Sequence, residues 1–138
     1  CTSRGVLHCD IKTENIILDL ATGEAKLIDF SCSMYIKDML RRQHAPGELC
    51  LYPTGTQVYS PLEWILFHCY HGHPVMIWSL GIQLYDTMCR FLPFIRDEDI
   101  ILGHYLLPTC QHLIRWCLST HLSDRPSLED LFNHFWLQ

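Results

Sequence analysis

The chain lacks an excess of basic residues. Its 138 residues carry ten Lys and Arg against fifteen Asp and Glu, which gives a formal net charge of −5. A protein that binds nucleic acid or a membrane surface needs a basic face for that purpose. We therefore expect neither nucleic acid nor a membrane among the partners of this chain.

Long hydrophobic runs are also absent. The longest apolar stretch, Val75 to Leu84, is interrupted by polar and small residues and is too short to span a bilayer. No basic start followed by an apolar run and a cleavage site is present, so we expect no signal peptide. Hydrophobic residues nevertheless make up 49% of the chain, which is enough to build the core of one domain or of part of one.

Paired cysteine motifs are missing as well. None of the eight cysteines forms a C-x-x-C pair. Without a secretory signal, this pattern favours reduced thiols and a protein of the cytoplasm, with the nucleus as a second compartment. A zinc site is a weaker alternative, because zinc ligands usually come in pairs from two separated segments. The crowded residues that would form it are His68, Cys69, His71 and His73.

The chain does contain a clear change of pattern along its length. Two short β-branched runs, 16–18 and 25–28, flank a turn at 21–23 and predict a hairpin. From 31 to 55 the periodicity is lost, which indicates a long functional loop. Everything after Pro61 is helical in pattern, and the stretch 75–89 is apolar on nearly all faces, as in a buried central helix. We expect helices over 63–70, 75–89, 97–103 and 109–118, and a last one that opens at Ser127 with Asp130 three residues on.

Six short motifs follow one another in a fixed order. Residues 8–15 read His-Cys-Asp-Ile-Lys-Thr-Glu-Asn, and Asp-Phe-Ser follows at 29–31. Each motif alone is weak, since a polar loop could hold these residues by chance. Together and in this order they indicate the catalytic half of a protein kinase. The remaining four are Gly-Thr at 55–56, Pro-Leu-Glu at 61–63, Trp-Ser-Leu-Gly at 78–81 and Asp-Arg-Pro at 124–126.

The residue types suit phosphoryl transfer, in which a protein mostly positions groups and stabilises charge. Asp10 can accept the proton of the substrate hydroxyl, and Lys12 can reach the oxygens of the transferred phosphoryl group. Asn15 and Asp29 offer the hard oxygen ligands that Mg²⁺ requires. We therefore predict that Asp10, Lys12 and Asn15 are catalytic, and that Asn15 and Asp29 hold the metal and the nucleotide cofactor.

Two further pairings are expected around this set. Thr56 is placed to hydrogen-bond Asp10 and Lys12, which would tie the substrate platform to the base. Glu63 and Arg125 can form a buried ion pair with a structural rather than a catalytic role.

The residues in and around these motifs closely resemble those of the Pim family of Ser/Thr protein kinases, over nearly the whole chain. The resemblance implies a kinase-like C-terminal lobe, mainly α with a short β-hairpin that carries the metal-binding residues. It also implies ATP and Mg²⁺ as cofactors, protein substrates with Ser or Thr, a substrate-contacting Glu14, and a structural His8 packed under Phe30. The matching stretches are 5–8, 14–16, 26–30, 58–61, 68–72, 78–82 and 111–118.

Several positions depart from the usual kinase pattern. Cys9 stands where kinases usually carry an Arg that grips an activation-loop phosphate. Ser31 replaces a Gly after Asp-Phe, which removes backbone freedom at the metal-binding turn. Met76 stands where most kinases have Asp, and the loop from 31 to 55 is longer than in the family, with added basic residues at Arg41 and Arg42.

The sequence contains no Gly-rich loop and no strand lysine of the kind that holds ATP in kinases. We therefore expect residues 1–138 to form the C-terminal part of a protein kinase domain, with the N-terminal lobe as a missing partner. Two functions remain open: a Ser/Thr kinase whose isolated fragment is inactive, and a degenerate lobe that acts as a pseudokinase or binding module. We also expect the central helix to keep an uncovered apolar face in this chain.

Overall fold

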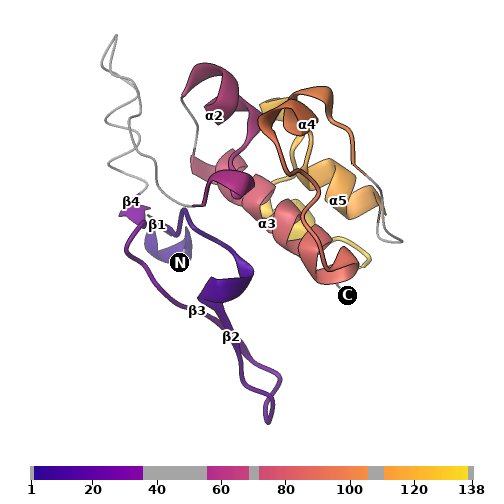
Figure 1. Cartoon of the computed structure of the whole chain (residues 1–138). Coiled ribbons are helices and arrows are strands. Elements are labelled where there is room, and N and C mark those ends of the chain that lie inside the picture. Colours follow the sequence, from indigo (N-terminus) through magenta and orange to yellow (C-terminus); the bar gives the residue numbers. More distant parts are fainter. Residues whose placement is uncertain (1, 36–55, 69–71, 106–110, 137–138) are drawn as a thin grey trace.

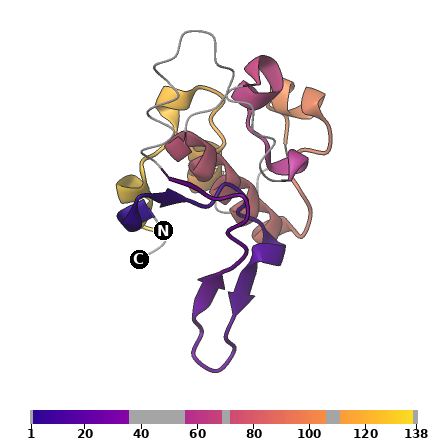
Figure 2. The same ribbon diagram turned by 90° about the vertical axis from the view of Figure 1, so that its left-hand side faces the viewer.

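The computed structural model describes residues 2–35, 56–68, 72–105 and 111–136. Helices make up one compact body around a long central helix, and a slender hairpin extends away from it in both views (Figures 1 and 2). This arrangement agrees with the expected helical lobe that carries a small hairpin.

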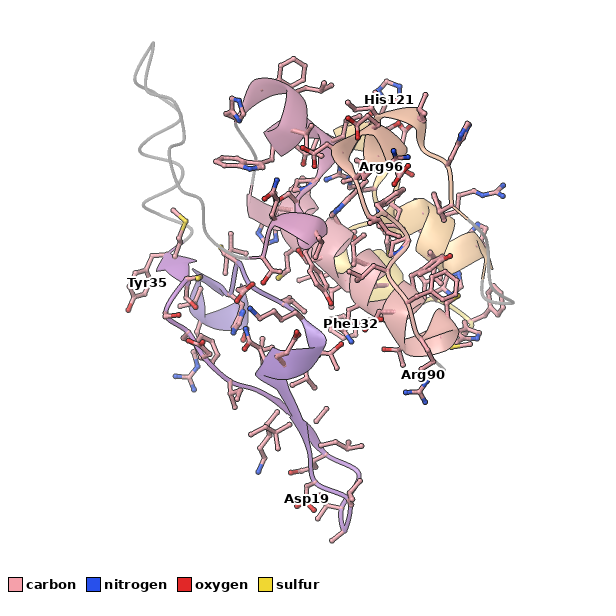
Figure 3. The ribbon with its side chains drawn as sticks, viewed as in Figure 1. Asp19, Tyr35, Arg90, Arg96, His121 and Phe132 are labelled. Atoms are coloured by element: carbon pink, nitrogen blue, oxygen red, sulfur yellow. The ribbon has the colours of Figure 1, made fainter. Side chains whose placement is uncertain are left out.

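The hairpin consists of β2 (Ile16–Leu18) and β3 (Ala25–Leu27), which pair antiparallel with Ile16 opposite Leu27. Its tip is stabilised locally, since the Asp19 carboxylate accepts a hydrogen bond from the backbone N–H of Ala21 at 2.9 Å. Gly23 supplies the positive φ of 74° that the turn needs. Asp19 lies at the far end of the hairpin (Figure 3). The hairpin prediction is confirmed.

A second, two-stranded sheet was not predicted. β1 (Val6–Leu7) pairs antiparallel with β4 (Met34–Tyr35), so the non-periodic stretch expected from residue 31 begins with a strand. Two residues are too few to show alternation, and the partner strand lies far away in sequence. The rest of the expected loop, including Arg41 and Arg42, lies outside the described residues.

The helices follow the predicted order. α3 (Gly72–Cys89) begins three residues before the expected start, because Pro74 is tolerated in a first turn. α4 (Asp97–Leu102) is followed by Gly103, whose φ of 64° terminates it, and the Ser127 hydroxyl accepts from the Asp130 N–H at 3.1 Å to cap α6 (Leu128–Phe132). The other bounds are α2 (Leu62–Phe67) and α5 (Gln111–Cys117), with 3₁₀ turns at Thr2–Arg4, Thr13–Asn15, Gln57–Tyr59 and Leu122–Asp124.

The core sits around α3, which packs closely on α5. Trp78, Ile82 and Tyr85 are fully buried together with Ile114 of α5. The expectation of an uncovered apolar face on α3 is wrong. Among the α3 residues whose burial is described, Met88 is the single large hydrophobic residue that is exposed. The chain's own α5, β1 and C-terminal segment cover the helix.

The hairpin carries several of the exposed large apolar residues. Ile17, Leu18 and Leu20 are 53%, 54% and 89% exposed. Among the described elements, no helix lies beside the distal part of the hairpin in either view (Figures 1 and 2). Within the described ranges, no helix combines the length and the hydropathy that a membrane span requires.

Candidate active site

Asp10 lies in the loop between β1 and the Thr13–Asn15 turn, and its side chain is 9% exposed. One carboxylate oxygen, Oδ1, accepts hydrogen bonds from the backbone N–H of Thr56 at 3.1 Å and from its hydroxyl at 3.2 Å. The other oxygen, Oδ2, lies 2.8 Å from the ammonium of Lys12. The carboxylate is therefore fixed in one orientation by donors on both oxygens.

Thr56 ties this loop to a segment 46 residues further along the chain. Besides binding Asp10, its hydroxyl oxygen accepts a hydrogen bond of 2.8 Å from the Lys12 ammonium. Asp10, Lys12 and Thr56 thus form a closed triangle of contacts, as the motif order led us to expect.

Asn15 ends the short turn that follows Asp10 and is buried. Its amide nitrogen donates to the Asp10 carbonyl at 2.9 Å and to Asp10 Oδ2 at 3.1 Å. Because the nitrogen points at Asp10, the amide oxygen occupies the opposite branch of the side chain, where it is available as a hard ligand.

Asp29 is brought to Asn15 by the hairpin. The N–H of Ile28, its immediate neighbour, donates to the Asn15 carbonyl at 2.8 Å. Asp29 is exposed and adopts a left-handed φ of 58°, a conformation that is uncommon for a residue with a side chain and that concentrates at functional sites. Its carboxylate accepts from the Ser31 N–H at 3.2 Å.

The pKa values of both carboxyl groups are lowered. Burial alone would raise the pKa of Asp10, but hydrogen bonds and charge from Lys12, with further bonds from Thr56, lower it below its ordinary value. The pKa of Asp29 is lowered chiefly by its hydrogen bonds from Ser31, with a smaller contribution from the positive charge of Lys12. The charge of Lys12 thus contributes to the lowered pKa of both carboxyl groups.

His8 connects the Asp10 loop with the segment that ends at Asp29. It is 1% exposed, its Nε2 lies 2.8 Å from the Ile28 carbonyl, and its Nδ1 accepts from the Asp10 N–H at 3.3 Å. The Phe30 ring meets the His8 ring edge-on, with centroids 4.8 Å apart. His8 and Phe30 are therefore in the contact that the resemblance implied.

A polar cluster next to the site was missed in the sequence. The Thr13 hydroxyl hydrogen-bonds Asp86 Oδ2 at 2.9 Å and also lies 3.0 Å from the Gln83 amide nitrogen. Asp86 and Gln83 belong to α3 and lie 73 and 70 residues from Thr13 in the sequence, so no local pattern predicts these contacts. Glu14 is exposed beside this cluster, and its charge, like that of Asp86, adds to the burial that raises the pKa of Tyr59.

Glu63 and Arg125 form a bidentate ion pair. The two guanidinium nitrogens lie 2.8 and 2.7 Å from the two carboxylate oxygens, and the side chains are 8% and 1% exposed. Arg125 also donates to the carbonyls of Pro74 and Ser119 and stacks 4.7 Å from the Trp78 ring centroid. These contacts join the start of α2, the start of α3 and the segment before α6.

The donor set at the site suits Mg²⁺ better than zinc. Asn15 and Asp29 offer two oxygen ligands, and Mg²⁺ commonly takes one or two protein groups and completes its shell with water and phosphate. Among the described residues, no group of three or more His, Cys, Asp and Glu is arranged to hold a metal ion. The weaker zinc hypothesis concerned a set of which Cys69 and His71 lie outside the described residues.

Comparisons with known proteins identify the family of this chain. The model of the protein kinase domain matches residues 1–137. Serine/threonine-protein kinase pim-2 of Danio rerio is 42% identical over 142 residues, which cover 99% of this chain and 43% of that protein. Serine/threonine-protein kinase prk-2 of Caenorhabditis elegans is 37% identical over 147 residues, which cover 100% of this chain and 31% of that protein.

The chain thus spans less than half the length of either relative. The resemblance to Pim kinases and the kinase-like fold class are confirmed by these matches. The chain belongs to the protein kinase domain family.

Proposed function

We propose that this chain forms the catalytic-loop to C-terminal part of a Ser/Thr protein kinase, which transfers the γ-phosphate of ATP to Ser and Thr hydroxyls of proteins. The observation that carries the proposal is the position of the Asp10 carboxylate. Donors from Lys12, Asn15 and Thr56 hold it in one orientation beside the segment of Asp29.

In this mechanism Asp10 orients the substrate hydroxyl and accepts its proton. A carboxylate with a lowered pKa is ionised at neutral pH and is a weak base, which suits a reaction in which proton transfer occurs late. Lys12, held at 2.8 Å from both Asp10 and Thr56, places a positive charge where the phosphoryl oxygens would develop negative charge.

The oxygens of Asn15 and Asp29 would hold Mg²⁺, and Mg²⁺–ATP would supply the phosphoryl group and neutralise its charge. Thr56 and the exposed Glu14 would form the platform for the protein substrate. His8, Phe30 and the Glu63–Arg125 pair keep these segments in place and act on no substrate atom.

The whole protein requires further groups to hold the nucleotide, and we propose that an N-terminal kinase lobe provides them. Kinases hold the phosphates with a Gly-rich loop and a strand lysine, and residues 1–138 contain neither motif. We propose the cytoplasm as the compartment, with the nucleus as a second one, because the described cysteines are free thiols.

The test is phosphate incorporation into Ser/Thr peptides by the full-length protein that contains this chain, with wild type beside Asp10→Asn. Loss of general-base catalysis lowers rates by about 10²–10⁴-fold, so we expect kcat to fall by at least about 100-fold without a loss of folding. Asp97→Asn, an exposed carboxylate at the start of α4, is the matched control and should keep wild-type turnover.

The alternative function is a non-catalytic lobe, and Cys9 and Ser31 are the residues that favour it. A full-length protein that folds, binds no Mg²⁺–ATP and gives the same background signal as its Asp10→Asn variant would replace the kinase proposal with a pseudokinase or binding module.

A further inference from the structure

The turn that carries Asn15 is attached to α3 by the hydroxyl of Thr13. Thr13 begins this 3₁₀ turn, directly after Lys12. Its hydroxyl donates to Asp86 Oδ2 at 2.9 Å and lies 3.0 Å from the Gln83 amide nitrogen, from which it accepts. Both views place the turn beside the C-terminal half of α3 (Figures 1 and 2). The hydroxyl therefore uses its donor and its acceptor capacity on the same helix.

The part of α3 that holds Thr13 is a rigid support. Gln83 and Asp86 directly follow Ile82 and Tyr85, which are both fully buried in the core. Close packing of such residues leaves the adjoining helix backbone little freedom to shift. The exposed Thr13 is therefore attached to a fixed point of the fold.

Within the turn, Thr13 is linked to its neighbours on both sides. The Asn15 N–H donates to the Lys12 carbonyl at 3.0 Å, and the Ile16 N–H donates to the Thr13 carbonyl. These two bonds close the turn, so a displacement of Thr13 is passed on to the Lys12 ammonium and to the Asn15 amide.

Thr13 also lies next to the segment that follows Thr56. Burial raises the pKa of Tyr59, and hydrogen bonds from Thr13 oppose this rise. The Gln57–Tyr59 turn begins directly after Thr56 and packs on α3 as well. Three segments of the site thus meet at Thr13.

We propose that Thr13 is a positioning residue for phosphoryl transfer, which holds its turn against α3 and thereby fixes the places of Lys12 and Asn15. This inference rests on the proposed function. Thr13 acts through its two neighbours, because its hydroxyl is engaged with α3. A displacement of about 1 Å at reacting groups can lower a rate about 100-fold, so an attachment outside the chemistry has a measurable effect on kcat.

The kinetic test uses the full-length protein with Thr13→Val, which removes the hydroxyl at nearly constant size, and Thr13→Ser, which keeps it. We expect Thr13→Val to lower kcat by about 10–100-fold while the KM for a Ser/Thr peptide changes less than about threefold. Thr13→Ser should stay within about threefold of wild type. Thr22→Val makes the same chemical change at the hairpin tip, where the Thr22 hydroxyl accepts from the Glu24 N–H, and should leave kcat unchanged.

Removal of the partners on α3 gives a second route to the same result. Gln83→Ala together with Asp86→Ala should lower kcat as Thr13→Val does, and adding Thr13→Val to this pair should lower it no further. A wild-type kcat in Thr13→Val, an equal loss in Thr13→Ser, or losses that multiply in the triple variant would each overturn the proposal.

Hydrogen exchange tests the attachment without any measurement of activity. The amides of Asn15 and Ile16 should exchange about tenfold faster in Thr13→Val than in wild type or Thr13→Ser, while the Leu118 amide in the core keeps its wild-type rate. Unchanged exchange at Asn15 and Ile16, or equal acceleration at Leu118, would refute a positioning role. A wild-type protein without turnover would count against the kinase proposal, whereas the exchange rates would still decide whether Thr13 holds the turn.

Discussion

At the scale of single residues, two opposing effects of unequal size set the pKa of Asp10. Burial disfavours its charge, yet contacts with Lys12 and Thr56 outweigh burial and lower its pKa in the folded state. A group whose folded pKa is lowered contributes stability that is fully present above its unfolded pKa and is lost as pH falls through the folded pKa. The contribution of Asp10 should therefore vanish in acid.

We predict that the destabilisation caused by Asp10→Asn is largest at neutral pH and shrinks below about pH 4, the ordinary pKa of an Asp carboxyl. Denaturant unfolding of both proteins between neutral pH and the acid transition measures the difference. The exposed Asp97→Asn variant should give no comparable change with pH. A destabilisation by Asp10→Asn that stayed constant into acid would show that the carboxylate's charge contributes nothing to folding.

The Glu63–Arg125 pair gives a second prediction at this scale. Breaking a buried pair leaves one charge without its partner and costs about 3–5 kcal/mol. We expect Glu63→Gln to lower the free energy of unfolding by an amount of this order, because both side chains are nearly inaccessible to water. The matched control is Glu24→Gln on the hairpin, whose pair with Lys26 is 3.8 Å long and mostly exposed. Its loss should cost less than about 1 kcal/mol, and equal costs at the two sites would contradict the structural role of Arg125.

At the scale of elements, the contact of α3 with α5 depends on Gly81. A Cβ atom at this position would lie 2.7 Å from the Cys117 Cβ and 2.8 Å from a Leu118 methyl group, closer than real contacts allow. We predict that Gly81→Ala lowers the free energy of unfolding by about 1–3 kcal/mol through overpacking, despite the better helix propensity of Ala.

Thr87→Ala, at an exposed position of the same helix, should change the free energy of unfolding by less than about 0.5 kcal/mol. Thermal unfolding monitored by circular dichroism checks both variants. A stabilised Gly81→Ala protein would mean that the two helices can separate without cost.

Elements with their own local signals could be predicted from the sequence. The hairpin has β-branched strands and a turn with Gly23, and α6 has Ser127 and Asp130 as its capping pair, so both were found. β4 was not found, because Met34 and Tyr35 become a strand only by pairing with β1.

In the candidate site, too, the residues of short local motifs could be predicted, whereas contacts between distant segments could not. Asp10, Lys12 and Asn15 lie within six residues of one another, and their order with Asp29 is enough to name them. Contacts such as that between Thr13 and Asp86 form only because α3 packs beside the loop. The residues next to Thr13 and Asp86 in the sequence give no sign that the two side chains meet. The left-handed φ values of Cys9 and Asp29 are likewise hard to predict, since a positive φ is uncommon for residues other than Gly.

At the scale of the whole molecule, regulation should not require a phosphate near Cys9. Burial and the charge of Cys32 hold its pKa at about 11, so the side chain is a neutral thiol and cannot make the charge-assisted grip that an Arg gives a phosphate. We predict that phosphatase treatment leaves the activity of the full-length enzyme essentially unchanged. A large loss would assign the phosphate-binding role to another basic residue, such as Arg41 or Arg42.

The 138-residue chain studied alone should show no kinase turnover and should self-associate. Without groups that position the nucleotide, about 7–11 kcal/mol of barrier lowering is out of reach. Its exposed apolar residues on the hairpin offer an association surface. Size-exclusion chromatography and a peptide phosphorylation assay test the two statements, and Ile17→Thr together with Leu20→Glu should shift the chain towards monomer. A monomeric wild-type chain whose turnover was abolished by Asp10→Asn would refute both.

The bond between Glu63 and Arg125 also sets the order in which this chain can fold during synthesis. Arg125 emerges from the ribosome 62 residues after Glu63, so until then the nascent chain holds a carboxylate that has no buried partner. The same delay applies to the α5 residues that cover Gly81 on α3. Formation of the hairpin needs only neighbouring residues, whereas the helical body can close only once the last quarter of the sequence is available. A nascent chain arrested before Arg125 should therefore be digested rapidly by protease, and one released after α6 should be protected.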